Sequence, residues 1–357
     1  MLIFGGRSAE HDVSRVTAVS VARALDPDRY EVIPVAITQD GRWLDAAEAR
    51  ALISTDVELP QGLPVSGETL TNIGAAIAES GELSASAFGA DVVFPLVHGP
   101  FGEDGTLQGL LELADIPYVG SGVLGSAVGM DKVMMKRALV ACGIDVADWL
   151  EFRDGEDLGV FCEAVAAELG FPCFVKPANM GSSIGISKAK NQGELKAAVN
   201  LATRYDEWVL VEEAIIGREI EVAVLGDLDP QASRPGEVVP GAEFYTYADK
   251  YEDSSAQLIA PADLSPLEEF EVRSLALEAF AACRLSGMAR VDFFLATDGR
   301  GFLVNEVNTI PGFTPISMYP RLWGISGVDY PALLDQLIET ALARHARRAS
   351  REGRARD

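Results

Sequence analysis

Apolar positions in the first 120 residues alternate between strand-like runs and helix-like spacing. Short apolar runs at 2–4, 30–38 and 91–97 predict β-strands, while 11–25, with Val13, Val16 and Val19 along one side, and 106–114 predict helices. Strands that alternate with helices favour a parallel α/β domain, which we expect to end near Gly120. The first strand is so short that we expect the natural chain to begin a few residues earlier.

Two further blocks follow in the chain. Helices at 131–142, 156–169 and 192–205, with strands at 149–152, 173–177 and 208–213, predict a compact α+β unit. A third block begins with a strand at 219–225 and continues through a polar and aromatic stretch to 260. Ser265 and Pro266 then form a helix start. Strands at 288–296 and 302–308 flank the turn at Asp298-Gly299, and helices at 316–322 and 329–348 complete the fold.

The pattern therefore predicts a fold with α/β and α+β parts in three domains. We expect an N-terminal α/β domain at 1–122, a central subdomain at 123–211, a C-terminal subdomain at 212–345 and a basic tail at 346–357. Residues 344–357 contain six arginines, and we expect this end of the chain to be solvated or frayed.

Charge and composition narrow the function. The chain has 29 Lys and Arg against 54 Asp and Glu, a net charge of −25, which disfavours binding to nucleic acid or an anionic membrane. Its apolar runs are too short to span a bilayer and it begins without signal-peptide features, so we expect a cytoplasmic protein. The four cysteines have no C-x-x-C spacing, which favours reduced thiols.

The two predicted C-terminal strands contain the most informative polar residues. Side chains two residues apart share one face of a strand, so Arg290 points with Asp292, and Glu306 points with Asn308. Two carboxylates and an amide oxygen suit Mg²⁺ bound to nucleotide phosphates, and Arg290 could stabilise developing charge. A solvated hairpin face with incidental charges explains the same spacing equally well.

A glycine- and serine-rich loop at 179–185 follows the predicted strand that contains Lys176. Backbone N–H groups and hydroxyls of such a loop can cradle phosphates, although the sequence lacks a Walker motif and an ordinary turn explains the glycines as well. Lys132 opens a helix, where a lone lysine is most often a surface charge.

Three other features are ambiguous on their own. Residues 120–125 match G-x-G-x-x-G but lie far from the first strand-to-helix turn, so a dinucleotide site is disfavoured. His98 and the glycines at 99–105 end a strand, where open α/β sheets bind ligands, yet a histidine satisfied within its loop is the simpler interpretation. Glu10 stands at a helix start, where it could merely complement the helix dipole.

Together these stretches resemble the D-alanine:D-alanine ligases of the ATP-grasp superfamily from the first residues to about Arg344. The motifs that carry the resemblance occur in family order: GGRSAEHDVS, HGPFGEDG, GMDK, FVKPANMGSSIG, EEAIIGREIEV, YADKY, ARVDFF and NEVNTIPGFTPISMYP. The resemblance implies a three-domain ATP-grasp fold. It also implies that ATP phosphorylates the carboxylate of one D-alanine and that the amine of a second attacks the acyl phosphate, which supplies D-alanyl-D-alanine for peptidoglycan precursors.

The resemblance also assigns the ATP side of the site. Two Mg²⁺ (or Mn²⁺) ions would be held by Asp292, Glu306 and Asn308. The nucleotide would be contacted by Lys132, Lys176, Lys250, Ser183, Glu212, Glu213, Ala214, Ile215 and Glu219. Within this group the lysines contact phosphates, Glu212 takes the adenine amino group, and Glu219 takes the ribose hydroxyls. The resemblance leaves open whether a monovalent cation is also required.

On the substrate side, the resemblance places the amine of the first D-alanine near Glu10 and His98, with Ser182 and Tyr251 hydrogen-bonded toward Glu10. Arg290 would stabilise the acyl phosphate and the tetrahedral intermediate. The carboxylate of the second D-alanine would be held by Gly312, Ser317 and Met318. Residues 245–258 resemble the family's lid, which excludes water.

Relatives that make D-alanyl-D-lactate tend to have histidine where this chain has Tyr251, so the dipeptide is favoured here. The resemblance implies a homodimer. Three alternatives remain: an ATP-dependent ligase for a different amine, a nucleotide-binding regulator without turnover, and a scaffold bound through the basic tail.

Overall fold

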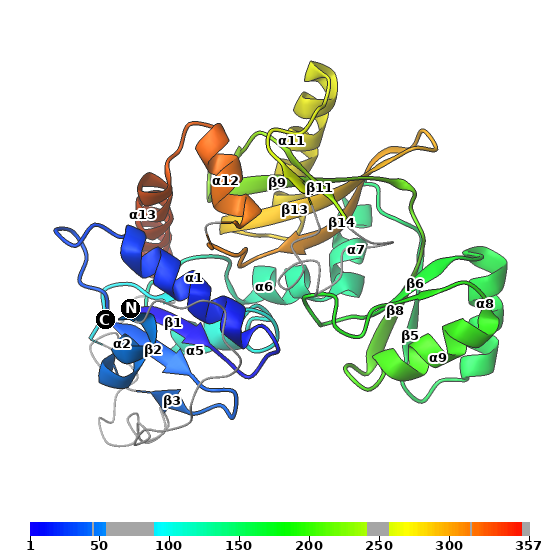
Figure 1. Ribbon diagram of the computed structural model, residues 1–357, viewed down its shortest axis with the longest axis horizontal. Coiled ribbons are helices and arrows are strands. Elements are labelled where there is room, and N and C mark those ends of the chain that lie inside the picture. The colour runs from blue at the N-terminus through cyan, green and yellow to red at the C-terminus, as the bar shows by residue number, and fades with distance from the viewer. Residues whose placement is uncertain (45, 55–88, 241–256, 315, 352–357) are drawn as a thin grey trace.

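The computed structural model describes residues 1–44, 46–54, 89–240, 257–314 and 316–351 of the chain. Figure 1 shows three units, with the N-terminal unit in blue, the central subdomain in green and the C-terminal sheet between them. Across the described ranges, no helix has the length and apolar character that a membrane span requires. The predicted three-unit α/β and α+β architecture is confirmed.

The N-terminal unit is a four-stranded sheet in the order β3-β2-β1-β4. Its strands and helices are β1 (Leu2–Gly5), α1 (His11–Ala24), β2 (Pro34–Ile37), β3 (Trp43–Leu44), α2 (Ala46–Ser54), β4 (Phe94–Pro95) and α5 (Thr106–Leu113). β1 pairs in parallel with both β2 and β4, as predicted, while β3 is antiparallel. β4 is shorter than the predicted strand because only Phe94 and Pro95 are in register with β1.

The central subdomain has a four-stranded antiparallel sheet, β5-β8-β6-β7. Its elements are β5 (Trp149–Arg153), α8 (Leu158–Glu168), β6 (Cys173–Pro177), β7 (Ser187–Ala189), α9 (Gln192–Ala202) and β8 (Trp208–Glu213). A core of its own fills the space between this sheet and its two helices. The expected domain boundary after residue 211 falls inside β8.

The C-terminal unit is an antiparallel sheet in the order β12-β11-β9-β13-β14, with β10 paired to β9. Its elements are β9 (Gly217–Gly226), β10 (Gln231–Ala232), β11 (Gly236–Val239), β12 (Gln257–Ile259), α11 (Pro266–Ala282), β13 (Gly287–Ala296), β14 (Gly301–Asn308), α12 (Met318–Ile325) and α13 (Tyr330–Ala349). Ser265 and Glu268 form a capping box that starts α11 where the sequence predicts it.

Two helices connect the first unit to the second: α6 (Val123–Met130) and α7 (Lys132–Ala141). α6 has no counterpart among the predicted elements, since its glycines lower helix propensity. Those glycines allow close packing: a Cβ at Gly125 would lie 2.8 Å from the Arg284 carbonyl oxygen, and one at Gly129 would lie 2.6 Å from a Thr309 methyl. The G-x-G-x-x-G match therefore leads into a packed helix.

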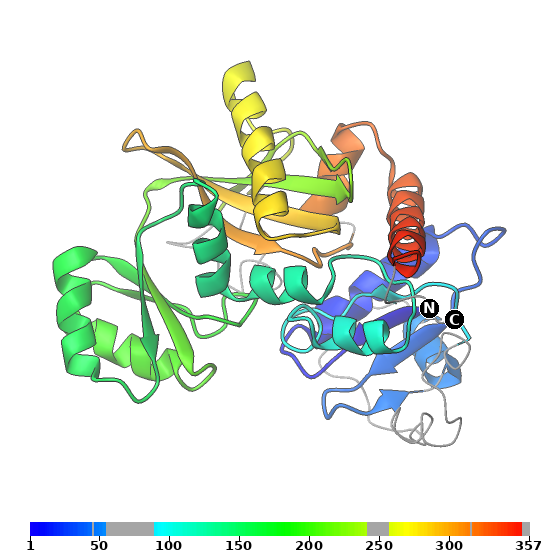
Figure 2. The ribbon, with the colours of Figure 1, turned by 180° about the vertical axis from the view of Figure 1, so that it is seen from behind.

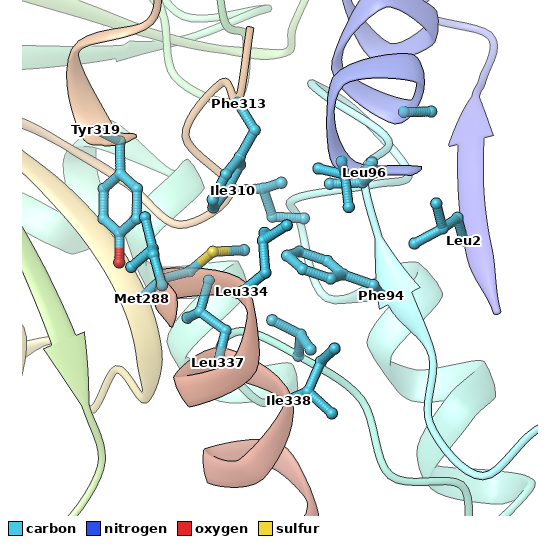
Figure 3. Packing of buried hydrophobic residues seen from close by; sticks show 14 of the residues in the cluster. Leu2, Phe94, Leu96, Met288, Ile310, Phe313, Tyr319, Leu334, Leu337 and Ile338 are labelled. Atoms are coloured by element: carbon cyan, nitrogen blue, oxygen red, sulfur yellow. The ribbon is translucent and has the colours of Figure 1, made fainter. Parts of the chain in front are cut away.

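One hydrophobic core joins the N-terminal unit to the C-terminal sheet and α13. Figure 3 shows Phe94 of β4 facing Leu334 of α13, with Met288 of β13 close by. The Phe94 and Phe313 rings meet edge to face, with centroids 5.7 Å apart. Seen from behind, α13 again lies against the N-terminal unit (Figure 2).

The expectation of a solvated basic end is wrong for the arginines of α13. Arg344 is buried and donates hydrogen bonds to the carbonyls of Gly120 and Tyr118 and to the Ser286 hydroxyl. Arg347 pairs with Asp227, and Arg348 pairs with Glu112. One face of α13 is buried against the other units, and the arginines on or beside that face therefore find partners there. The number of arginines in the sequence does not indicate this burial.

Replacing Arg344 with methionine should destabilise the protein by about 2–4 kcal/mol, because two buried carbonyl groups lose their donor. The measurement is the free energy of unfolding in urea. Arg351→Met, which removes an exposed charge just past the same helix, is the matched control and should change stability by less than about 0.5 kcal/mol. Equal effects of the two substitutions would contradict this account of Arg344.

Candidate active site

Two adjoining cavities lie where the three units meet. One has a volume of about 390 Å³ and is bordered by α1, α12 and β14; the other, of about 310 Å³, is bordered by β6, β8, β9 and β13. Residues that line both cavities mark their junction: Lys132, Met180, Gly181, Ser182, Glu221, Arg290 and Glu306. Every predicted site residue within the described ranges lines at least one of them, whereas Lys250 and Tyr251 lie outside those ranges.

Glu10 lies directly before α1 and faces the loop that follows β6. The Ser182 hydroxyl donates a hydrogen bond to Glu10 Oε1, which brings together two residues distant in sequence. A Cβ at Gly99 or Gly181 would lie 2.8 or 2.9 Å from Glu10 Oε2, so both glycines make room for the carboxylate. Ser182 itself has a φ of +49°, an uncommon backbone conformation held at the junction of the cavities.

His98 is buried in the wall of the larger cavity. Its Nδ1 lies 3.0 Å from the Ile310 carbonyl oxygen, which can only accept, so Nδ1 carries a proton. Nε2 lies 3.4 Å from the Thr17 hydroxyl. Burial lowers the pKa of His98, against the opposing charge of Glu10, and favours the neutral ring. Both ring nitrogens of His98 thus have polar partners within the fold, and the residue also lines the larger cavity.

The β13–β14 hairpin places the predicted metal ligands beside Arg290. Arg290 is opposite Asn308, and Asp292 is opposite Glu306. The Arg290 guanidinium donates to both Asp292 oxygens at 2.7 Å, and its Nε lies 3.3 Å from Glu221 Oε2. Burial would lower the pKa of Arg290, but Asp292 and Glu221 outweigh burial and raise it, so the positive charge persists.

The donors on this hairpin fit a hard divalent cation. Asp292 lines the smaller cavity, Asn308 lines the larger one, and Glu306 lines both. In the described part of the chain, no three Asp, Glu, His or Cys side chains gather in a metal-binding group. With the predicted Asn308 amide, the hairpin would offer three oxygen ligands, which leaves room for phosphate oxygens and water, as is usual for Mg²⁺.

The smaller cavity combines cationic and acidic side chains. Lys176 pairs with Glu212 and lies 3.3 Å from Asn305 Oδ1, while Lys132 donates to the Met180 carbonyl at 2.5 Å. Burial lowers the pKa of Lys132, and the charge of Glu306 opposes this effect. The remaining predicted nucleotide residues line the same wall: Ser183, Glu213, Ala214, Ile215 and Glu219.

The carboxylate of Glu213, a residue predicted to contact the nucleotide, is held by other parts of the chain. Its carboxylate accepts hydrogen bonds from Arg300 at 2.5 and 3.0 Å and from the Asp148 backbone N–H at 2.9 Å. Its side chain is thus fixed in place, and the residue lines the smaller cavity. The sequence does not show this, because Arg300 belongs to the distant hairpin turn.

Gly312, Ser317 and Met318 meet at the start of α12. Ser317 is the N-cap residue, and its hydroxyl accepts from the Thr314 N–H at 3.0 Å. A Cβ at Gly312 would lie 2.8 Å from that hydroxyl. The N-terminal end of α12 thus faces the larger cavity, where helix N–H groups favour a carboxylate.

Comparisons with known proteins match this arrangement over nearly the whole chain. The family described as D-ala D-ala ligase N-terminus matches residues 1–121, and the family described as D-ala D-ala ligase C-terminus matches residues 138–339. The D-alanine--D-alanine ligase of Geobacillus kaustophilus is 47% identical, over 96% of this chain and 94% of its own length. The chain belongs to the D-alanine–D-alanine ligase family.

Other relatives agree with this membership. The D-alanine--D-alanine ligase of Kineococcus radiotolerans is 49% identical, over 96% of both chains. The D-alanine-D-alanine ligase structure from Coxiella burnetii has a TM-score of 0.80 at 36% identity and covers 97% of this chain and 94% of its own. The D-Ala:D-Ser ligase structure from Enterococcus faecalis has a TM-score of 0.78 at 33% identity, covering 95% and 98% respectively.

Two buried residues of this family member were not among the residues predicted from the sequence. Glu103 accepts hydrogen bonds from the backbone N–H of Gly99 at 2.6 Å and of Ile310 at 3.2 Å, and it lines the larger cavity. Lys136 pairs with Glu212 at 3.1 Å behind the smaller cavity. Glu103 stands in the motif HGPFGEDG, and Lys136 follows Lys132 by one helical turn; neither spacing alone indicates burial.

Glu103 should make stability depend on pH. Burial, reinforced by the charge of Glu10, raises the pKa of Glu103 to about 8, above its ordinary value. The folded state then holds a proton that the unfolded chain releases at lower pH, so stability falls as the pH rises from about 5 to about 8.

Glu103→Gln should reduce this slope, which can be measured as the free energy of unfolding in urea at intervals between pH 5 and 8.5. Asp104→Asn, at the neighbouring half-buried loop position, is the control and should keep the wild-type slope. An unchanged slope in Glu103→Gln would show that Glu103 is ionised throughout this range.

Proposed function

We propose that this chain is an ATP-dependent ligase that joins two molecules of D-alanine to give D-alanyl-D-alanine for peptidoglycan precursors. The observation that carries the proposal is the meeting of two cavities at one cationic and acidic junction. The larger cavity suits two small amino acids, and the smaller one suits a nucleotide. A phosphoryl group at the junction would be within reach of both.

The chemistry requires a carboxylate to become an electrophile. The terminal phosphoryl group of ATP passes to the carboxylate of the first D-alanine, which gives an acyl phosphate and ADP. The amine of the second D-alanine then attacks the acyl carbon, loses a proton and displaces inorganic phosphate. Positioning and charge neutralisation dominate such phosphoryl transfer. Lys132 and Arg290 provide positive charge at the junction, and Lys176 provides it in the smaller cavity.

Membership of this family supports the use of ATP and a divalent cation. We assign Asp292, Glu306 and Asn308 as ligands of two Mg²⁺ or Mn²⁺ ions. When bound, these ions neutralise charge on the phosphate oxygens. Because Asp292 is engaged by Arg290 in this structure, binding of a cation requires the carboxylate to share its oxygens between the two.

The larger cavity supports roles for residues from both ends of the chain. Glu10, which accepts a hydrogen bond from Ser182, would also accept one from the ammonium group of the first D-alanine, with the neutral His98 ring beside it. Arg290 would stabilise negative charge on the acyl phosphate and on the tetrahedral intermediate. Gly312, Ser317 and the Met318 backbone would bind the carboxylate of the second D-alanine. Tyr251 and Lys250 are assigned from the resemblance alone, as are the homodimer and a cytoplasmic location.

Product identification tests the proposal directly. The protein is incubated with ATP and Mg²⁺ together with D-alanine, D-serine and D-lactate in competition, and the products are analysed by mass spectrometry. We expect D-alanyl-D-alanine as the main product, with ADP and phosphate released in equal amounts. A predominance of D-alanyl-D-serine or D-alanyl-D-lactate at neutral pH would overturn the substrate assignment, and ATP hydrolysis without a joined product would overturn the ligase assignment.

Arg290→Ala should lower kcat by about 10²–10³, the effect of removing one stabiliser of transition-state charge. ADP affinity should change little, because the guanidinium lies at the junction and the predicted base and ribose contacts lie elsewhere. Phosphate release gives kcat, and calorimetric titration gives the Kd for ADP. Thermal melting checks that the variant is folded. Unchanged turnover would remove Arg290 from its assigned role.

A further inference from the structure

Lys136 is buried behind the nucleotide cavity without lining it. Its side chain is 1% exposed and extends from α7, one turn beyond Lys132. The ammonium group contacts Glu212 Oε2 at 3.1 Å, donates to the Ala147 carbonyl at 3.0 Å, and lies 5.5 Å from the centroid of the Trp149 ring. Lys136 does not line the cavity, and Glu212 is the cavity-lining residue that it contacts directly.

Glu212 is clasped by two lysines from different elements. Lys136 of α7 contacts one carboxylate oxygen, and Lys176 of β6 contacts the other. Burial raises the pKa of Glu212, but the two lysines together lower it to about 2. Other charged groups that interact with this cluster include Lys132 and Glu213. Glu212 therefore presents an ionised carboxylate, which can accept hydrogen bonds but cannot donate one.

The two lysines differ in whether a bound nucleotide can reach them. Lys176 lines the cavity and also contacts Asn305, so bound phosphate could draw it away from Glu212. Lys136 lies outside the cavity and its other contacts are internal. It is thus the partner that keeps the charge and position of Glu212 constant when the nucleotide binds.

A fixed acceptor in the cavity wall discriminates between purine bases. A 6-aminopurine offers an N–H group to the carboxylate. A 6-oxopurine places a carbonyl oxygen there, which repels the carboxylate and leaves both acceptors without a donor. Sites built around such a buried polar group reject ligands that cannot pair with it.

We propose that Lys136 is a specificity-determining positioning residue, which holds Glu212 as a charged acceptor so that the site takes 6-aminopurine nucleotides and rejects 6-oxopurine nucleotides. This inference rests on the proposed function, which assigns the smaller cavity to ATP. Lys136 touches neither nucleotide nor substrate, and it acts only through the carboxylate that it positions.

The test compares ADP with IDP, which differ at position 6 of the purine. Calorimetric titrations give the Kd of each diphosphate for the wild-type protein and for Lys136→Met. We expect ADP to bind about 10-fold or more weakly to Lys136→Met, as when a charge-assisted hydrogen bond is weakened, while IDP binding changes less than about 3-fold. Lys136→Arg should recover part of the ADP preference.

A control variant and a pH series separate positioning from general disruption. Arg137→Met removes a positive charge from the next residue of α7, whose exposed side chain pairs with Glu151, and it should leave both Kd values unchanged. In Lys136→Met, loss of one opposing charge raises the pKa of Glu212. The ratio of ADP affinity to IDP affinity should therefore fall in Lys136→Met as the pH falls from 8 to 6, whereas the wild-type ratio stays level, because titration of the diphosphate affects both nucleotides alike. Equal weakening of ADP and IDP, or an unchanged ratio, would overturn the proposal.

A double variant keeps the test decisive if Lys136→Met fails to fold. Glu212→Gln alone should reduce the preference for ADP, because an amide can pair with either base. Adding Lys136→Met to Glu212→Gln removes the charge of Lys136 as well as that of Glu212. The second substitution should change the ratio of ADP affinity to IDP affinity no further, and an additional change would contradict action through Glu212. Since ADP binding requires no D-alanine, the absence of ligase turnover would reject the proposed function while leaving this result readable.

Discussion

The antiparallel register of β13 with β14 is the constraint on which the active site depends. It places Arg290 opposite Asn308 and Asp292 opposite Glu306. One face of the hairpin therefore carries both the Arg290 guanidinium and the carboxylates beside it. The neighbouring strand β9 supplies Glu221 opposite Asp292. A shift by one residue would turn these side chains into the core of the C-terminal unit and replace them with apolar ones.

The other two units pack around the hairpin and place further polar residues beside it. The N-terminal unit contributes Glu10 and His98 because its sheet is joined to the C-terminal unit through a common core. The central subdomain contributes Lys176 and the serine loop from the other side. Glycines at 99 and 181 leave space for the Glu10 carboxylate between them. The site is thus an assembly of three units, and no one unit contains it.

Local patterns in the sequence predicted the regular elements well, since burial of periodic apolar positions determines them. Strands β6 and β8 and the start of α11 occur at the predicted residues. Alternation along the strands also predicted the grouping of Arg290 with Asp292. In contrast, α6 was not predicted, because its glycines serve packing against Arg284 and Thr309, which are distant in sequence.

The remaining surprises concern charges whose partners come from elsewhere in the chain. Arg344 resembles a tail residue until Gly120 and Ser286 are placed beside it. Lys136 and Glu103 have ordinary local surroundings, and their burial arises only when α7 meets β8 and when the loop after β4 meets Ile310. The family resemblance assigned the residues around the reacting atoms, and the structure adds those that support them.

The division of the hydrophobic cores determines where the molecule can hinge. Separating the N-terminal unit from the C-terminal sheet would expose their shared core, whereas the central subdomain encloses a core of its own. A rigid-body rotation of the central subdomain is therefore the less costly movement. Such a rotation would widen the smaller cavity and carry residues 180–182 away from the larger one, while the larger cavity kept its walls from α1, β14 and α12.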